Sequence, residues 1–350
     1  MLDQQISTTY IRSLVNQKVE SVISSRLKQA EEIHPAYVKF WQQILNASLA
    51  GGKRLRAYLT VVGYGKIDDD ILSVATAQEL LHIAMYIHDD VIDADFIRHG
   101  QKNINGSYFD DYKNIVSTDE ARHYANSMAI LAGDALLSEA YQLTNNTHFS
   151  AAIKAQLNHQ LGVSIFEVIG GELLDVEASF IKNMEVNPIT VYRYKTASYS
   201  TAGPLIAGAY CAGQSAKTID QLNSIAIDIG VAYQIQDDIL GVFGSESKTG
   251  KSTIGDLREG KKTLLIEKHQ NQMNQAQQRR FDSTFGNEQA DAAAFVALKQ
   301  DIIDSKAKQR TEEYIDFYFD KANKEIAKLA DSRLANQLVD LIEKLASRSN

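Results

Sequence analysis

The chain has 350 residues, a net charge of −8 and a single cysteine, Cys211. Its acidity argues against nucleic acid as a partner, because binding to a phosphate backbone requires a basic surface. One cysteine excludes an internal disulfide and any site built from several cysteines, and it favours the cytoplasm as the location.

The sequence favours long helices. Only three prolines occur, and good helix formers dominate the rest. Apolar residues recur at helical spacing through residues 14–27, and no sustained period-two alternation predicts a strand. Neither a signal peptide nor a run of about eighteen apolar residues is present, so we expect no membrane span. We predict one all-α domain, residues 1–350.

Local signals mark several helix starts and loops. Ser117 with Glu120 three residues later predicts a capping box, and Pro188 suits a first helical position. The segments 103–114 and 244–256 are rich in glycine, serine, asparagine and aspartate, so we expect loops there.

The first acidic motif is HDDVID, residues 88–93, after an apolar helical stretch. Asp89 and Asp93 are four residues apart, so on a helix their carboxylates lie on one face and can converge on a shared cation. Magnesium prefers such oxygen ligands together with substrate phosphates. An isolated motif of this kind is more often a solvated helix end, but its apolar context makes an uncompensated pair costly.

A second acidic motif, YQIQDDILG, covers residues 233–241 and also ends an apolar helical run. Here Asp237 and Asp238 are the carboxylates, because position 241 is Gly241. Two such motifs about 150 residues apart predict two facing helices that clamp magnesium and a diphosphate between them.

Cations cluster around these motifs. GGKRLR, residues 51–56, places three of them after two glycines that let a backbone approach an anion, although a surface basic turn is an equal alternative. His82 lies two helical turns before Asp89, where it either lines the same cavity or is simply packed. GKST at 250–253 is not a phosphate-binding loop, because Ser245 stands where the earlier glycine is required.

Taken together, these motifs resemble the trans-isoprenyl diphosphate synthases, the polyprenyl synthetase family, and geranylgeranyl diphosphate synthases in particular. The resemblance runs from about Gly51 to Leu265 and rests on GGKRLR, HDDVID, Arg98, KTAS, YQIQDDILG and GDLREGKKT in family order. It implies a bundle of antiparallel helices around a deep central cavity, commonly dimeric. The implied reaction joins isopentenyl diphosphate to an allylic diphosphate with release of diphosphate.

The resemblance also implies residue roles. The carboxylates implied to hold magnesium, about three ions in the family, are Asp89, Asp93 and Asp237. The cations implied to contact the allylic diphosphate are Arg98, Lys195, Lys251 and Lys261. The residues implied to hold isopentenyl diphosphate are Lys53, Arg56, His82 and, in place of a second arginine, His99. The catalytic set is Lys195, Thr196 and Gln234, the last two presenting oxygen dipoles to the allylic cation. Asp175 matches a cavity-facing acidic position, and Pro204 is expected to kink a helix.

Two departures from the family pattern concern His99, which is largely neutral near pH 7, and Gly241, which replaces the last aspartate of the second motif. Product length depends on the residues four and five before Asp89, where aromatic side chains stop chain growth in the family. Here they are Met85 and Ala84. The small Ala84 predicts geranylgeranyl diphosphate (C20), with a medium- or long-chain product as the alternative.

Three rival interpretations use the same sequence. A class I terpene cyclase needs serine or threonine at position 241 and glutamate at 245, whereas Gly241 and Ser245 stand there. A non-catalytic partner subunit would be expected to have lost metal carboxylates, and a purely structural helical protein would not carry so many matching charges. We therefore predict a magnesium-dependent prenyltransferase, expected to be a homodimer.

Overall fold

The computed structural model describes residues 7–98, 100–181, 185–244 and 253–347. Helices dominate it, and the all-α prediction is confirmed. The chain forms two compact units, one of residues 1–162 and 203–215 and the other of residues 163–202 and 216–350. The single domain predicted from the sequence stays a prediction.

The first unit contains the two elements that carry GGKRLR and HDDVID. Its helices and strands are α1 (Thr8–Glu31), α2 (Pro35–Leu49), α3 (Leu55–Tyr64), α4 (Asp69–Ile92), β1 (Ile97–Arg98), β2 (Gln101–Lys102), α5 (Ile104–Tyr112), α6 (Thr118–Asn145) and α9 (Gly203–Cys211). Helix α7 (Ala151–Phe180) begins in this unit and continues into the second.

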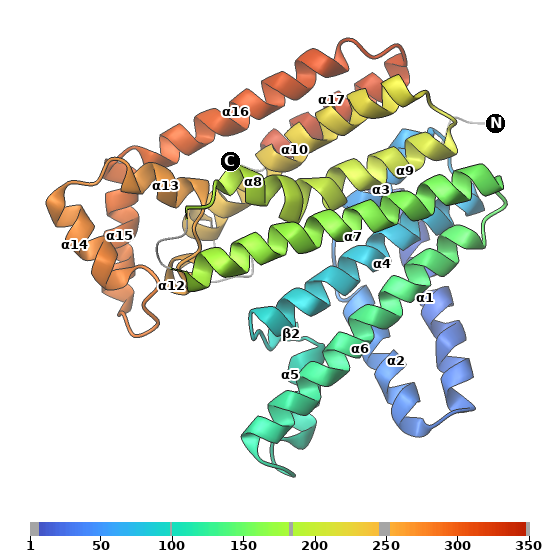
Figure 1. The fold of residues 1–350 in the computed structure, drawn as a ribbon, viewed down its shortest axis with the longest axis horizontal. Coiled ribbons are helices and arrows are strands. Elements are labelled where there is room, and N and C mark those ends of the chain that lie inside the picture. Colours follow the sequence, from blue (N-terminus) through green and yellow to red (C-terminus); the bar gives the residue numbers. More distant parts are fainter. Residues whose placement is uncertain (1–6, 99, 182–184, 245–252, 348–350) are drawn as a thin grey trace. The chain divides into compact units, whose positions relative to one another are not determined.

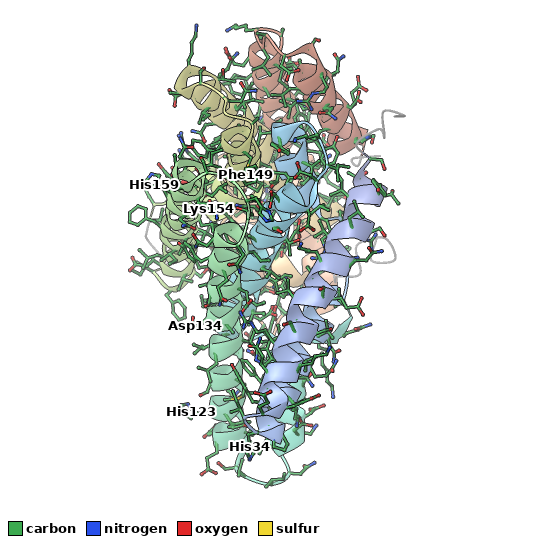
Figure 2. The ribbon with its side chains drawn as sticks, turned by 90° about the vertical axis from the view of Figure 1, so that its right-hand side faces the viewer. His34, His123, Asp134, Phe149, Lys154 and His159 are labelled. Atoms are coloured by element: carbon green, nitrogen blue, oxygen red, sulfur yellow. The ribbon has the colours of Figure 1, made fainter. Side chains whose placement is uncertain are left out.

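Helix α4 forms the centre of the first unit. It is apolar on nearly all sides, as a helix must be when neighbours surround it, and it packs against α1, α3, α6 and α9. Gly63 of α3 and Gly208 of α9 allow these two helices to touch, because a Cβ at either position would overlap the facing backbone. Phe149, labelled in Figure 2, packs edge to face on Tyr64 with ring centroids 5.8 Å apart.

The second unit carries KTAS and the second acidic motif. It comprises the rest of α7, then α8 (Pro188–Val191), the π-helix η1 (Tyr192–Ala202), α10 (Ala216–Phe243), α12 (Gly255–Glu259), α13 (Leu264–Gln270), α14 (Gln275–Thr284), α15 (Ala292–Asp304), α16 (Ala307–Ile326) and α17 (Ser332–Ala346). Helix α10 packs against η1 and α16, and α16 runs beside it in Figure 1. A separate apolar cluster including Phe281 and Phe295 joins α12 to α15.

The local predictions had mixed outcomes. Ser117 forms the predicted capping box with Glu120, and Pro188 is the first residue of α8. Segment 103–114 is not a loop, since Asn103 caps the helix α5, and the hairpin β1–β2 was not expected. Residues 245–252 of the other predicted loop lie outside the described residues. Among the described helices, none is both long and apolar enough to cross a bilayer.

Candidate functional site

The first acidic motif lies at the carboxyl-terminal end of α4. Asp93 is the C-cap, and its N–H donates to the Asp89 carbonyl at 2.8 Å, so the two residues are one helical turn apart as predicted. The carboxylates therefore gather at the negative end of a helix dipole, where they are unfavourable without a counter-charge. Asp89 is partly exposed, whereas Asp90 is buried.

Arg98 supplies part of that counter-charge. It lies in β1 of a tight hairpin and pairs with Gln101 of β2. Its Nε donates to Asp90 Oδ1 at 2.8 Å, and its Nη2 lies 3.3 Å from Asp89 Oδ2. Burial raises the pKa of Asp90, and the contacts from Arg98 oppose that rise. Arg98 is thus a structural partner of the acidic motif in addition to its predicted contact with a diphosphate.

His82 is connected to the same motif through an aromatic side chain. The imidazole packs edge to face on Tyr86, with ring centroids 5.5 Å apart, and the Arg98 guanidinium lies 4.9 Å from the centroid of the Tyr86 ring. Tyr86 donates its hydroxyl hydrogen to the Ala47 carbonyl at 2.8 Å. Tyr86 and Arg98 therefore connect His82, predicted to hold isopentenyl diphosphate, to the first acidic motif.

His88, the first residue of HDDVID, has a packing role. Its Nε2 lies 3.2 Å from the Ile130 carbonyl and 3.7 Å from the carboxylate of Asp134, which Figure 2 shows midway along α6. A Cβ at Gly133 would overlap the imidazole, so this glycine lets α6 approach. The contact holds the end of α4 against α6.

The three cations of GGKRLR have different surroundings. Lys53 is exposed and Arg56 is partly exposed, as expected of residues that meet a substrate. Arg54 is buried in a left-handed backbone conformation (φ 53°) and lies 3.4 Å from Glu79 Oε2 of α4. Glu79 also accepts the Ala57 N–H at 3.0 Å, at the positive end of α3. This clamp fixes the start of α3 to α4, where Glu79 lies about one turn before His82.

In the second unit, Lys195 lies against acidic residues of α7. Its Nζ is 3.0 Å from Glu172 Oε2 and 2.6 Å from Asp175 Oδ2. Gly171 makes this possible, because a Cβ there would overlap the backbone of Lys195. The predicted acidic position, Asp175, is therefore a direct partner of the predicted catalytic lysine.

Thr196 and Gln234, which the resemblance assigns to the catalytic set, are hydrogen-bonded to each other. Thr196 Oγ1 donates to Gln234 Oε1 at 2.9 Å, and Gln234 Nε2 donates to Asp238 Oδ1 at 2.8 Å. Tyr192 donates its hydroxyl hydrogen to the other Asp238 oxygen and accepts the Leu264 N–H at 2.8 Å. Neither Tyr192 nor the hydrogen bonds of Asp238 could be recognised in the sequence, because only the packing of η1 on α10 joins the two residues.

Comparisons with known proteins identify the family of the chain. Residues 38–302 match the family model for polyprenyl synthetase. The chain belongs to this family. A short chain isoprenyl diphosphate synthase of Methanocaldococcus jannaschii is 34% identical over 69% of the chain and 70% of the relative. A geranylgeranyl diphosphate synthase of Saccharolobus solfataricus is 28% identical over 79% and 77%.

A solved structure extends the similarity to almost the whole length. The geranylgeranyl pyrophosphate synthase of Corynebacterium glutamicum, crystallised with isoprenyl diphosphate and magnesium, has a TM-score of 0.90 and 26% identity. The similarity covers 97% of this chain and 98% of that one. The protein is thus a prenyltransferase of the polyprenyl synthetase family, and the recognition from motifs is confirmed.

One departure from the family pattern has a structural counterpart. A Cβ at Gly241 would overlap Oδ2 of Asp256, the aspartate of GDLREG on α12. Asp256 therefore brings a third carboxylate to the second motif, beside the position that an aspartate would occupy at 241. A role for Asp256 could not be recognised in GDLREG, since the contact depends on how α12 meets α10.

The remaining predicted residues are only partly described. Lys261 follows α12, and its Nζ lies 3.0 Å from Glu259 and 3.7 Å from Asp256. His99 and Lys251 lie outside the described residues. Of the two residues assigned to product length, Ala84 is fully buried in α4 and Met85 is partly exposed. The roles of all these residues stay predictions.

The two acidic motifs have the donors that magnesium requires. In each pair of aspartates the first, Asp89 or Asp237, is partly exposed, and the second is buried and hydrogen-bonded. Burial raises the pKa of Asp238 to about 7. Its hydrogen bonds with Tyr192 and Gln234 lower that pKa, and the nearby charges of Asp256 and Asp237 raise it further. Within the described residues, no three metal-binding side chains enclose an ion by themselves. Hard oxygen donors that repel one another fit a cation shared with substrate phosphates.

Proposed function

We propose that the chain condenses isopentenyl diphosphate with an allylic diphosphate to form all-trans geranylgeranyl diphosphate and releases diphosphate. The observation that carries this proposal is the common design of the two acidic motifs. Each offers one accessible carboxylate beside a buried, hydrogen-bonded partner. Arg98 lies 3.3 Å from Asp89, and Lys261 lies 3.7 Å from Asp256, whose carboxylate adjoins Gly241.

In this proposal Asp89, Asp93 and Asp237 would hold magnesium, and the bound ion would supply positive charge to the leaving diphosphate. Lys195 contacts the same diphosphate, and its partners Glu172 and Asp175 keep the ammonium oriented. Asp256 is an additional candidate for the metal site, because its carboxylate lies beside Gly241. The proposed number of ions, about three, comes from the resemblance.

The isopentenyl diphosphate site is proposed at the start of α3. Lys53 and Arg56 would bind its phosphates, with His82 and His99 completing the site. The clamp between Arg54 and Glu79 supports this proposal, since it fixes the backbone from which both cations project. A neutral His99 would bind phosphate more weakly than the arginine usual in the family.

We further infer a homodimer. On α7, Phe166, Ile169 and Leu173 are 80%, 57% and 59% exposed, and their spacing places them on one helix face. Large apolar side chains gathered on one surface are typical of an interface between proteins. A reducing compartment such as the cytoplasm is proposed from the single, buried Cys211.

The first experiment incubates the purified protein with magnesium, labelled isopentenyl diphosphate and, separately, C5, C10 or C15 allylic diphosphates, then separates the dephosphorylated products. A C20 alcohol is expected, and Asp89→Ala should lower kcat by about a hundredfold or more because the metal ligand is lost. The matched control is Asp119→Ala, an exposed residue in the first turn of α6 away from the motif, which should remain active. If no primer is elongated, the isolated chain is a partner subunit instead.

A further inference from the structure

The hydrogen bonds between η1 and α10 form a connected network of four side chains. Thr196 meets Gln234, and Tyr192, four residues earlier, meets Asp238, four residues later. η1 and α10 therefore run antiparallel, and the two hydrogen bonds are successive contacts between them. Asp238 links the two contacts, because its two oxygens accept hydrogen bonds from both Gln234 and Tyr192.

We propose that Tyr192 and Asp238 are positioning residues, which orient the Thr196 hydroxyl and the Gln234 amide so that oxygen lone pairs face the positive charge developing on the allylic substrate. This inference rests on the proposed function, in which Thr196 and Gln234 stabilise that charge. It adds two residues that need not touch the substrate themselves.

The chemistry of the donors and acceptors sets the direction. In its ionised form Asp238 can only accept hydrogen bonds, so Gln234 then turns its NH2 group toward Asp238 and its oxygen toward Thr196. The Thr196 hydroxyl hydrogen is then used in the bond to Gln234, and a lone pair of the Thr196 oxygen remains available to face the allylic substrate. If Gln234 were reversed, its NH2 would donate to Thr196 and release the hydroxyl hydrogen. If that hydroxyl hydrogen faced the allylic cation, it would repel the positive charge.

The surroundings hold this arrangement in place. Tyr192 and Asp238 are 5% and 9% exposed, so water does not compete effectively for their hydrogen bonds. The tyrosine oxygen is anchored by the Leu264 N–H, a backbone group that cannot rotate away. Gly230 of α10 brings the two helices together, since a Cβ there would overlap Ala197 and Thr201 of η1.

The test compares two inert ligands that differ in charge. One is a C10 ammonium compound with nitrogen in place of the reacting carbon, bound together with free diphosphate. The other is the C10 thio-diphosphate, called the neutral analogue here because its prenyl chain carries no charge. Tyr192→Phe keeps the ring and removes the hydroxyl. We expect about a tenfold loss of affinity for the ammonium analogue and a similar fall in kcat. Affinity for the neutral analogue and KM should stay within about twofold.

Two further variants make the result specific. Tyr318→Phe, on α16, removes a partly buried hydroxyl outside the network and should change neither affinity. Asp238→Asn keeps the side-chain shape but can donate to Gln234 and reverse it, so it should produce the same selective loss. Thermal melting shows whether each variant is folded.

The outcomes separate this inference from the function on which it rests. Selective weakening of the ammonium analogue in Tyr192→Phe supports it, and equal weakening of both analogues overturns it in favour of a purely structural role. An unchanged Tyr192→Phe, with Thr196→Val and Gln234→Leu impaired, overturns it but keeps their proposed roles. If those two variants are also unchanged, the proposed roles of Thr196 and Gln234 fail as well.

Discussion

Glu79→Gln tests whether the clamp at the start of α3 is structural. Glu79 and Arg54 are 3% and 4% exposed at their side chains, and Glu79 satisfies both that guanidinium and the Ala57 N–H. The amide keeps the shape but leaves Arg54 without its counter-charge, which destabilises by about 3–5 kcal/mol. At about 2–4 °C per kcal/mol, the melting temperature should fall by roughly 6–20 °C.

The assay is thermal unfolding followed by circular dichroism, with Glu312→Gln as the matched control. Glu312 is 47% exposed and lies 3.6 Å from Lys308, so its loss should change stability by less than about 1 kcal/mol. The KM for isopentenyl diphosphate should also rise in Glu79→Gln, because Lys53 and Arg56 lose a fixed backbone. A melting temperature equal to that of the control would refute the reasoning.

Three other predictions follow from buried or crowded positions. Gly241→Ala should lower kcat about tenfold by displacing Asp256, yet it should not lower the melting temperature, since alanine gains about 0.5–1 kcal/mol in a helix interior; unchanged kinetics would show that Asp256 is dispensable. Ala84→Phe should shorten the product, with overpacking costing about 1–3 kcal/mol, and chromatography showing only C20 would contradict the assignment of Ala84. His269→Leu should flatten stability against pH: burial lowers the pKa of His269 from 6.5, so the unfolded chain binds more protons and stability falls as the pH falls through about 6.5 toward the folded pKa. If the melting temperatures at about pH 8 and about pH 5.5 differ as much in His269→Leu as in the unsubstituted protein, this prediction is wrong.

The helical class and the local geometry of the first acidic motif could be predicted from the sequence, because both depend on local spacing. Asp89 and Asp93 could be placed on one turn from their separation alone, and the Ser117 capping box was recognisable from two residues. Thr196 and Gln234, by contrast, were paired only through the family resemblance. The structure adds their direct hydrogen bond.

What could not be predicted depends on contacts between distant segments. Spacing cannot tell which of neighbouring like charges is buried, and only the family resemblance left Arg54 out of the set assigned to isopentenyl diphosphate. Two-residue strands are too short to show a period, which hid the hairpin at Arg98. Segment 103–114 has a loop-like composition, but its Tyr108 is buried against Tyr124 of α6, and this packing outweighs the weak local propensity.

The glycine pair in α7 shows how differently two identical neighbours can be constrained. A side chain at Gly170 would meet nothing within 4 Å, whereas one at Gly171 would strike the backbone that carries Lys195. In a library that samples every amino acid at both positions, Gly170 should accept apolar replacements, which suit the face of Phe166 and Leu173 proposed above as a dimer interface. At Gly171, selection for prenyl transfer should return glycine alone. Mutational tolerance along this helix would therefore change abruptly between consecutive residues.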